Sequence, residues 1–288
     1  MTSSSKGGGP TPWWWPKNGS RRPRPRLLRR VEAPQHRTDN PFILDGYLPP
    51  LSLRGCLHSL LYVHNETGNI LTHVVPLLFI VARGPYWESL QELRAPLVTW
   101  LVLLVMALPW AASTLYHTFM AHHGGHRVYL ALLRLDIVCI CATVSLGPLP
   151  HVCVAALSLG TAAKAVLMLA YWLACLYSLI RALKATTTWQ CRTCFGPPLL
   201  IVVACWFLRV SPWGVGHPAG AVFIPPMMGL FVLGGVLGAV RVPERWAPGR
   251  LDLAGNSHQI MHVVMVAAQY YLFRGALIDL HWLLHEAF

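Results

Sequence analysis

Residues 256–272 read NSHQIMHVVMVAAQYYL and place two histidines at the start of a long apolar segment. His258 and His262 are four residues apart, so a helix would carry both imidazoles on one face. The residues that follow, 263–272, contain no charged side chain and suit a lipid environment. Because ionisable groups are costly inside a membrane, they usually have partners and a function there. The stretch therefore predicts a membrane helix with a functional site in its first turns.

The composition of the whole chain indicates a membrane protein. Of the 288 residues, 55% are hydrophobic and 12% are charged, and the mean hydropathy is +0.47. Soluble domains carry about 25% charged residues. The composition therefore excludes an ordinary soluble domain and favours a chain that crosses the bilayer several times.

The N-terminal part of the chain is strongly basic. Nine Lys and Arg residues precede residue 40, against only Glu32 and Asp39, and the formal net charge of the chain is +12. Residues 1–40 are rich in Gly, Pro, Ser and Arg, which predicts a disordered basic tail. Such a tail suits an anionic membrane surface. No nucleic-acid partner and no secretory signal are expected, since a membrane body follows and a short apolar core with a cleavage site is missing.

The cysteines do not indicate a disulfide framework. Five of the eight lie in apolar runs, where cysteine behaves as a small hydrophobic residue. Cys191 and Cys194 form one Cys-x-x-Cys motif, whereas a zinc ribbon needs two such pairs. Metal or redox use of this motif is therefore only a minor alternative.

Seven apolar segments follow the tail, each near the roughly 20 residues that cross a bilayer as a helix. They are predicted at residues 68–84, 96–118, 128–148, 160–182, 195–211, 220–241 and 255–274. Within residues 51–65, Leu57, Leu60 and Leu61 favour a short interfacial helix before the first span. The predicted fold class is all-α, a seven-transmembrane helix bundle, with residues 41–288 as one domain.

The basic residues of the connecting loops predict the orientation of the bundle. If the N-terminus is cytoplasmic, that side holds the tail and Arg54, Arg127, Arg181, Lys184, Arg192, Arg241, Arg245 and Arg250. The opposite side then holds Arg83, Arg94, Arg209 and Arg274. We therefore expect a cytoplasmic N-terminus and an extracytoplasmic C-terminus. Asn18 and Asn65 lie in glycosylation acceptor patterns and should carry no glycan in this orientation.

This orientation brings polar residues from three spans to one depth near the cytoplasmic face. His117 ends the second span, Asp136 lies about two turns into the third, and Ser113 precedes His117 by one turn. His258 and His262 occupy the first turns of the seventh span. Three imidazoles with an open fourth position are the ligand set of a catalytic zinc site. We therefore predict a Zn²⁺ ion held by His117, His258 and His262.

The remaining two polar residues suit catalysis around such an ion. Bound zinc lowers the pKa of a water ligand to about 7. Asp136 would then act as a base or orient the water, and Ser113 would hydrogen-bond the water or a substrate carbonyl. Each residue also has a structural interpretation: a histidine as an interhelical hydrogen bond, Asp136 as a partner of Arg134, Ser113 as a packing residue. Their common depth favours the metal.

A second polar cluster runs from His64 to His73 at the start of the first span. Glu66 near a helix N-terminus suits the helix dipole. Asn69 and His73 are four residues apart and share a helix face. For most of this cluster, a helix cap with a contact to a neighbouring helix is the simpler interpretation.

Several of these motifs resemble the progestin and adipoQ receptor (PAQR) family, which includes the adiponectin receptors. The matching motifs are HNETGNILTH at 64–73, STLYHTF at 113–119, Leu135-Asp136, RVPERWAPGRLD at 241–252 and SHQIMH at 257–262. Their order and spacing agree from about residue 41 to residue 275. The resemblance implies a seven-helix bundle with a cytoplasmic N-terminus. It also implies zinc held by His117, His258 and His262, with Asp136 approaching through water and Ser113 nearby.

The resemblance also carries a functional expectation. The family is related to alkaline ceramidases and to haemolysin III-type proteins, which implies a zinc-dependent hydrolase of the amide bond of a ceramide-like membrane lipid. The alternative is a non-enzymatic receptor or scaffold with structural zinc. Structural sites usually have four protein ligands, so His73 as a fourth ligand would favour that alternative.

Other functions and partners are less well supported. A transporter or channel is not favoured, because the chain has no repeated halves. Residues 279–288 lack the longer tail of the adiponectin-binding members, so adiponectin is not expected as a ligand, and no protein partner is predicted. The expected location is a multi-pass membrane protein of the endoplasmic reticulum, Golgi or plasma membrane.

Overall fold

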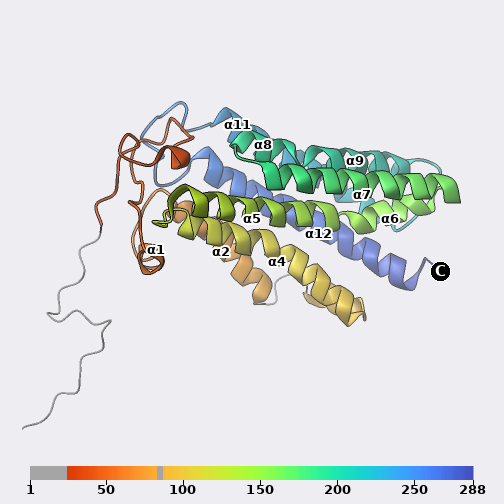
Figure 1. Ribbon diagram of the computed structural model, residues 1–288. Helices are drawn as coiled ribbons and strands as arrows, with labels where there is room; N and C mark the ends of the chain where they lie inside the picture. The colour runs from red at the N-terminus through yellow and green to blue at the C-terminus, as the bar shows by residue number, and fades with distance from the viewer. Residues whose placement is uncertain (1–24, 83–86, 288) are drawn as a thin grey trace, which may run out of the picture.

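The computed structural model describes residues 25–82 and 87–287, and these residues form a bundle of roughly parallel and antiparallel helices (Figure 1). Within these ranges the only β-pairing consists of two isolated bridges, Leu28 with Tyr47 and Leu51 with His122. Six helical segments are long and apolar enough to cross a membrane, and α2 (Thr67–Val81) is a shorter apolar helix. The described chain is therefore the predicted seven-helix membrane bundle.

The seven spans coincide with the predicted apolar segments. Four are single helices: α2, α4 (Pro96–Phe119), α7 (Thr161–Lys184) and α12 (Ser257–His285). The other three are each built from two helices. These pairs are α5 (Gly125–Leu146) with α6 (Leu149–Leu157), α8 (Thr188–Thr193) with α9 (Gly196–Val210), and α10 (Pro218–Val222) with α11 (Ile224–Val240).

Prolines mark these three junctions. Pro148 caps α6, and prolines occupy the first turns of α9 and α11. A proline lacks the backbone N–H that an interior helical position needs, but the first turn tolerates it. The third span was predicted to end at residue 148; the helix instead resumes after Pro148 and reaches Leu157.

The predicted interfacial helix is α1 (Leu53–Ser59), capped by Ser52, whose hydroxyl accepts a hydrogen bond from the Gly55 N–H at 3.2 Å. Leu57 on this helix and Leu61 just after it are 50% and 74% exposed. Apolar side chains this open to solvent suit a helix lying at a membrane surface.

A further short helix, α3 (Trp87–Glu92), precedes α4.

The predicted disordered tail is too long at its C-terminal end. Residues 1–24 lie outside the described residues, but the segment after them folds back on itself: the Leu28 N–H donates to Tyr47 O and the Arg30 N–H to Leu44 O, both at 2.7 Å. This segment contains the 3₁₀-helix η1 (Gln35–Arg37). Its order depends on backbone pairing with residues of the following segment, Leu44 and Tyr47, which composition cannot reveal.

Glu244 ties this N-terminal segment to the start of α12. Its carboxylate accepts hydrogen bonds from Asn40 Nδ2 at 2.9 Å and from the Ser257 backbone N–H and hydroxyl at 2.7 and 2.5 Å. Glu244 is fully buried. The contact therefore connects the N-terminal segment around Asn40 to the loop before α12 and to the first residue of α12, more than 200 residues along the chain.

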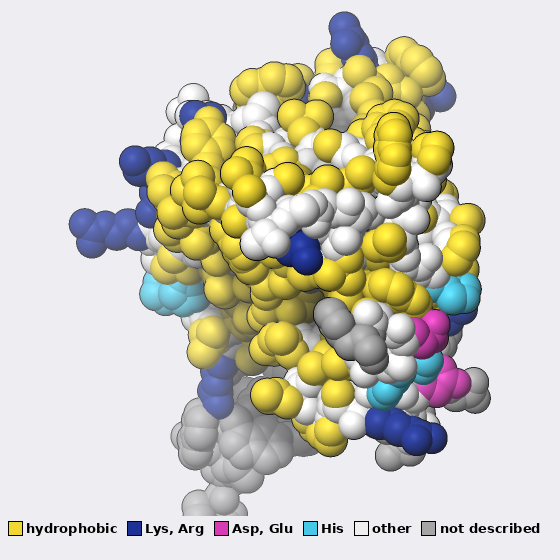
Figure 2. All heavy atoms as spheres, turned by 90° about the vertical axis from the view of Figure 1, so that its right-hand side faces the viewer, with side chains coloured by type: hydrophobic (Ala, Val, Ile, Leu, Met, Phe, Trp, Pro, Cys, Tyr) yellow, Lys and Arg dark blue, Asp and Glu magenta, His cyan; other side chains and the backbone are white. Residues whose placement is uncertain are grey.

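The seventh span, α12, packs against α2, α6, α10 and α11, and Figure 1 shows it running the length of the bundle. Viewed from the end where α12 finishes, hydrophobic side chains dominate the surface and charged side chains are scattered (Figure 2). Many large apolar residues on the helices are more than half exposed. Such a surface is unfavourable in water and suits the lipid around a membrane bundle.

A buried ion pair joins α9 and α12 near the end where α12 finishes. Arg209 Nη1 donates to Asp279 Oδ2 at 2.6 Å and lies 2.9 Å from His151 Nδ1 of α6. The Arg209 and Asp279 side chains are 1% and 0% exposed. This cluster links three spans at the end of the bundle away from the histidines predicted as metal ligands.

Candidate metal centre

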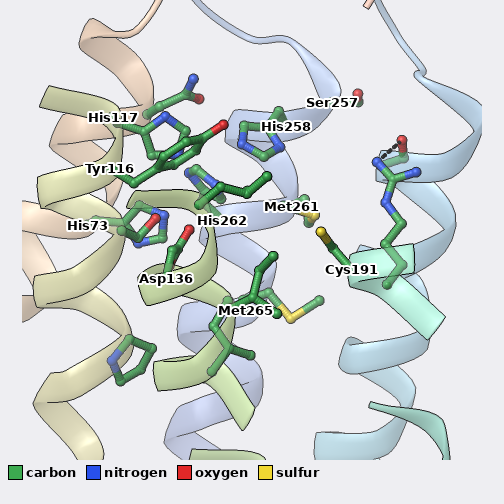
Figure 3. Close-up of a pocket in the computed structure, with 18 of the residues that line it drawn as sticks. His73, Tyr116, His117, Asp136, Cys191, Ser257, His258, Met261, His262 and Met265 are labelled. Atoms are coloured by element: carbon green, nitrogen blue, oxygen red, sulfur yellow. Dashed lines mark hydrogen bonds between the residues drawn. The ribbon is translucent and has the colours of Figure 1, made fainter. Parts of the chain in front are cut away.

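The three histidines predicted as zinc ligands converge, although they come from α4 and α12 (Figure 3). The His117 ring centroid lies 5.4 Å from that of His258 and 5.3 Å from that of His262. The His258 and His262 centroids are 4.3 Å apart. His117 and His262 are buried, at 3% and 4% exposure. The tertiary structure therefore places these side chains within reach of one another.

His73 of α2 joins this group. Its ring centroid lies 3.9 Å from that of His262 and 5.9 Å from that of His117. Among the described residues, His73, His117 and His262 each offer one ring nitrogen such that these three atoms lie within 4.8 Å of one another. His258 lies beside this set. The geometry thus offers four imidazoles, and the tightest three include His73 in place of His258.

Two of the histidines are oriented by side chains of α2 and of the residue that precedes it. His117 Nδ1 lies 2.8 Å from Glu66 Oε2, and His262 Nδ1 lies 3.0 Å from Thr72 Oγ1. Engaging both Nδ1 atoms leaves the Nε2 atoms available to a shared ligand. Histidines that bind metals are usually held in this way, by a carboxylate or other polar group on the opposite ring nitrogen.

Glu66, which precedes α2, is anchored for this role. Its Oε2 accepts a hydrogen bond from Asn69 Nδ2 at 2.6 Å, and its Oε1 from Asn65 Nδ2 at 3.1 Å. Burial acts to raise the pKa of Glu66, but the hydrogen bonds and charge of His117, with Asn69, outweigh it and lower the pKa to about 2. A carboxylate that stays ionised at neutral pH favours a cation bound on the other side of the His117 ring.

Unpaired polar atoms also point to a ligand. Both ring nitrogens of His73 and Asp136 Oδ1 are buried and have no hydrogen-bond partner among the described residues. Leaving buried polar atoms unpaired is costly, so such groups usually bind an ion or a water. Neutral imidazole nitrogens suit Zn²⁺. The donor set therefore fits a zinc ion.

Asp136 and Ser113 lie beside the histidines. Ser113 lies beside the Asp136 carboxyl group, close enough for its hydroxyl to interact with that group. Figure 3 shows Asp136 directed toward the rings of His73 and His262. Both residues line the same cavity as the histidines and are nearly buried. The structure therefore brings together all five residues predicted from the sequence.

The cavity has a volume of about 740 Å³ and extends from the histidines between apolar side chains. Its apolar part is lined by residues of α9, α11 and α12, among them Leu199, Met227, Phe231, Met265 and Leu272. Volumes of this size are typical of sites that enclose most of a small ligand. The arrangement suits a molecule with a polar group near the histidines and a long apolar part.

The sequence interpretation missed the contacts of Glu66 and Thr72. Glu66, Asn69 and His73 are spaced i, i+3, i+7, which places all three on one helix face. That spacing was the available signal. The simpler interpretation of Glu66 as a helix-end residue concealed it, because nothing in the sequence shows that this face meets α4 and α12.

The fold and the site define an integral membrane protein whose buried histidine cluster faces an internal cavity. The chain belongs to the haemolysin III-related family, whose sequence model matches residues 61–273. This family contains the progestin and adipoQ receptors. The predicted family resemblance is confirmed.

Individual relatives match most of the chain. Progestin and adipoQ receptor family member 4 of Mus musculus is 38% identical over 276 residues, which cover 91% of this chain and 96% of the relative. The Homo sapiens member 4 is 37% identical over 267 residues, with the same coverage. The adiponectin receptor protein of Drosophila melanogaster is 27% identical over 293 residues, covering 84% of this chain and 57% of that protein. Two of these relatives are therefore member 4 of the progestin and adipoQ receptor family, matched over nearly their full length.

Proposed function

We propose that the protein is a zinc-dependent hydrolase of the amide bond in a ceramide-like membrane lipid. The observation that carries the proposal is the buried histidine cluster, oriented by Glu66 and Thr72 and open to a cavity with a long apolar extension. When bound, zinc supplies Lewis-acid polarisation of a carbonyl and lowers the pKa of a water molecule.

Asp136 is the candidate general base. Its Oδ1 atom is buried and has no hydrogen-bond partner among the described residues, and Ser113 lies beside the carboxyl group. A carboxylate held in this way accepts the proton of an attacking water and delivers it to the leaving amine nitrogen. Ser113 lies beside Asp136, so we assign it the positioning of that carboxylate in addition to the substrate or water contact expected from sequence.

The depth and shape of the cavity suit a lipid amide. His117 lies two residues before the end of α4, and His258 is the second residue of α12, so both lie within a turn of their helix ends. A lipid's amide linkage occupies a comparable depth, below the headgroup layer. The apolar wall would accept the acyl chain and exclude bulk water from the reacting groups.

Fatty-acid release by the purified full chain tests the proposal. In detergent with zinc, the chain is expected to release fatty acid from an N-acyl sphingoid lipid, and His262→Ala is expected to abolish the release. His123→Ala is the matched control, because this histidine is exposed in the loop after α4. Equal turnover by His262→Ala and the unmodified chain would exclude the mechanism.

A receptor or scaffold with structural zinc is the second candidate, and His73 favours it. A fourth imidazole close to His117 and His262 would complete a four-ligand site without room for a reacting water. In that case, removing zinc lowers the thermal stability of the protein, and the zinc-loaded protein shows no turnover of the amide substrate.

A further inference from the structure

The cavity continues from the histidines along one face of α12. The residues of α12 that line it beyond His262 recur at helical spacing and are Met265, Ala268, Gln269 and Leu272. Figure 3 shows His262 and Met265 on the same side of this helix. Apart from Gln269, whose Nε2 donates to Met106 O at 2.7 Å, this wall of the cavity is apolar.

Helix α11 lines the cavity over the same depth. Its lining residues are three or four positions apart and are Met227, Phe231, Gly235 and Gly238. Gly238 lies level with the histidines, because a Cβ atom there would lie 3.1 Å from the Sδ of Met261, the residue before His262. At 1.5 Å per residue, Gly238 and Met227 are about 16 Å apart along α11, and His262 and Leu272 are about 15 Å apart along α12. The two helices therefore give the same depth.

The deep end of the cavity is closed by packed side chains. Leu272 and Met227 line the cavity and also belong to the hydrophobic core. Beyond them the core contains Val152, Tyr171 and Phe273, each at most 1% exposed, and none of these three lines the cavity. Packed protein interiors contain few voids larger than a water molecule. A hydrocarbon chain that enters from the histidine end therefore stops at Leu272 and Met227.

The Leu272 side chain occupies space that a glycine leaves free. A Cβ atom at Gly147 would lie 2.8 Å from Leu272 Cδ2. Gly147 follows the last residue of α5, at the junction with α6. The break between these two helices therefore fixes the position of the residue that closes the cavity.

We infer that the cavity limits the acyl chain of its lipid to about 12 carbons, by a depth estimate from covalent geometry; the assignment rests on the amide hydrolase proposed above. With C–C bonds of about 1.5 Å, an extended chain advances about 1.25 Å per carbon, so about 12 carbons span the distance from the histidines to Leu272. An octadecanoyl chain is about six carbons too long on the same measure. Overfilling a closed interior forces packed side chains to move, which is unfavourable.

Two glycines of α11 offer a matched pair of variants. A Cβ atom at Gly235 would meet no atom within 4 Å, and Gly235 lines the cavity. A Cβ atom at Gly229 would also meet no atom within 4 Å, but Gly229 is exposed and does not line the cavity. The same substitution therefore fills the cavity at Gly235 and only enlarges the outer surface at Gly229.

Competition by a chain-length series tests the inference. The full chain, in one neutral detergent, binds a fluorescent N-acyl sphingoid lipid, and N-alkylsulfonyl sphingoid bases from octyl to octadecyl compete with it. The sulfonamide of these compounds resists hydrolysis. The octyl to dodecyl compounds are expected to compete equally well, and the octadecyl compound about tenfold more weakly, as the usual cost of overpacking predicts. Equal competition by the dodecyl and octadecyl compounds would overturn the inference.

Variants at the end and in the middle of the cavity should move the length limit in opposite directions. Leu272→Ala should extend it by about two to three carbons, the length of the side chain removed. Gly235→Leu should weaken binding of the dodecyl compound about tenfold or more, whereas Gly229→Leu should bind the series like the unmodified chain. Leucine favours a helix more than glycine does, so the glycine pair decides the matter even where Leu272→Ala fails to fold. Equal effects of the two leucine variants would contradict the inference.

Fatty-acid release from dodecanoyl and octadecanoyl sphingoid lipids separates this inference from the hydrolase. A length limit in binding by a protein without turnover retains the closed cavity and removes the hydrolase. Equal turnover of both lipids, together with equal binding of the dodecyl and octadecyl compounds, removes the length limit and retains the hydrolase.

Discussion

Glu66 and His117 are 51 residues apart in sequence, and their Oε2 and Nδ1 atoms lie 2.8 Å apart in the structure. The contact joins the start of α2 to the end of α4 and orients the His117 ring through its Nδ1 atom. Substitution of Glu66 therefore tests the proposed metal site without changing a proposed metal ligand.

Glu66→Gln is expected to lower zinc affinity by about 10- to 100-fold, the usual cost of losing a carboxylate behind a histidine ligand. Competition with a calibrated chelator measures the change. Glu286→Gln, which alters an exposed glutamate that pairs with His281 at 3.5 Å, is the control and should leave the affinity unchanged. Unchanged affinity in Glu66→Gln would show that the contact does not support a metal.

Alanine variants of His73 and His258 decide between the two possible ligand sets. The set predicted from the sequence requires that His258→Ala lose zinc and that His73→Ala retain one zinc per chain. Zinc is counted by elemental analysis of the purified proteins. The reverse result would assign the ion to His73, His117 and His262, the nitrogen set that lies within 4.8 Å. Loss in both variants would favour four ligands and a structural role.

Asp279→Asn is expected to destabilise the bundle by about 3–5 kcal/mol, because it leaves the buried Arg209 charge without its partner. The free energy of unfolding in detergent measures the effect. Glu286→Gln breaks an exposed pair and should cost less than about 1 kcal/mol. If the two substitutions had similar effects, the buried pair would not contribute to stability.

The loop before α12 should loosen in acid. Burial acts to raise the pKa of Glu244, but hydrogen bonds from Ser257 and Asn40 outweigh it and lower the pKa below its ordinary value. A lowered pKa stabilises the folded loop above the unfolded value of about 4.3, and this contribution is lost as the pH falls through the folded value.

Hydrogen-exchange protection of the Ser257 amide measures that change. Protection should be constant from neutral pH to about pH 5 and fall in more acidic solution. Glu244→Gln should remove the pH dependence and show reduced protection throughout. If Glu244→Gln still lost protection of the Ser257 amide in acid, the loss would be caused by a titratable group other than Glu244.

Glycan mapping tests the orientation. With a cytoplasmic N-terminus, Asn18 and Asn65 should stay unmodified when the chain is made in cells that glycosylate. Asn65 is 7% exposed and bonded to Glu66, whereas Asn18 lies outside the described residues. An endoglycosidase-sensitive shift that disappeared with Asn18→Gln would reverse the predicted orientation.

The spans were predictable because each depends on local composition. About 20 apolar residues cross a bilayer wherever they occur, and the four-residue spacing of His258 and His262 puts both on one face of any helix. The extent of the N-terminal segment was not predictable, since its order depends on backbone pairing between residues such as Leu28 and Tyr47. The composition of a segment reports which residues are near in sequence, and it does not report which backbone groups pair in the folded chain.

The sequence by itself determined the helical class, the seven apolar spans, the family and the depth at which polar residues collect, because all of these follow from local pattern. Only the tertiary structure decided that Glu66 and Thr72 orient the histidines, that His73 enters the cluster and that faces of α11 and α12 line one cavity of limited depth. Those contacts depend on how helices rotate and pack against one another. Helix rotation is set by the whole bundle, so no single stretch of sequence encodes it.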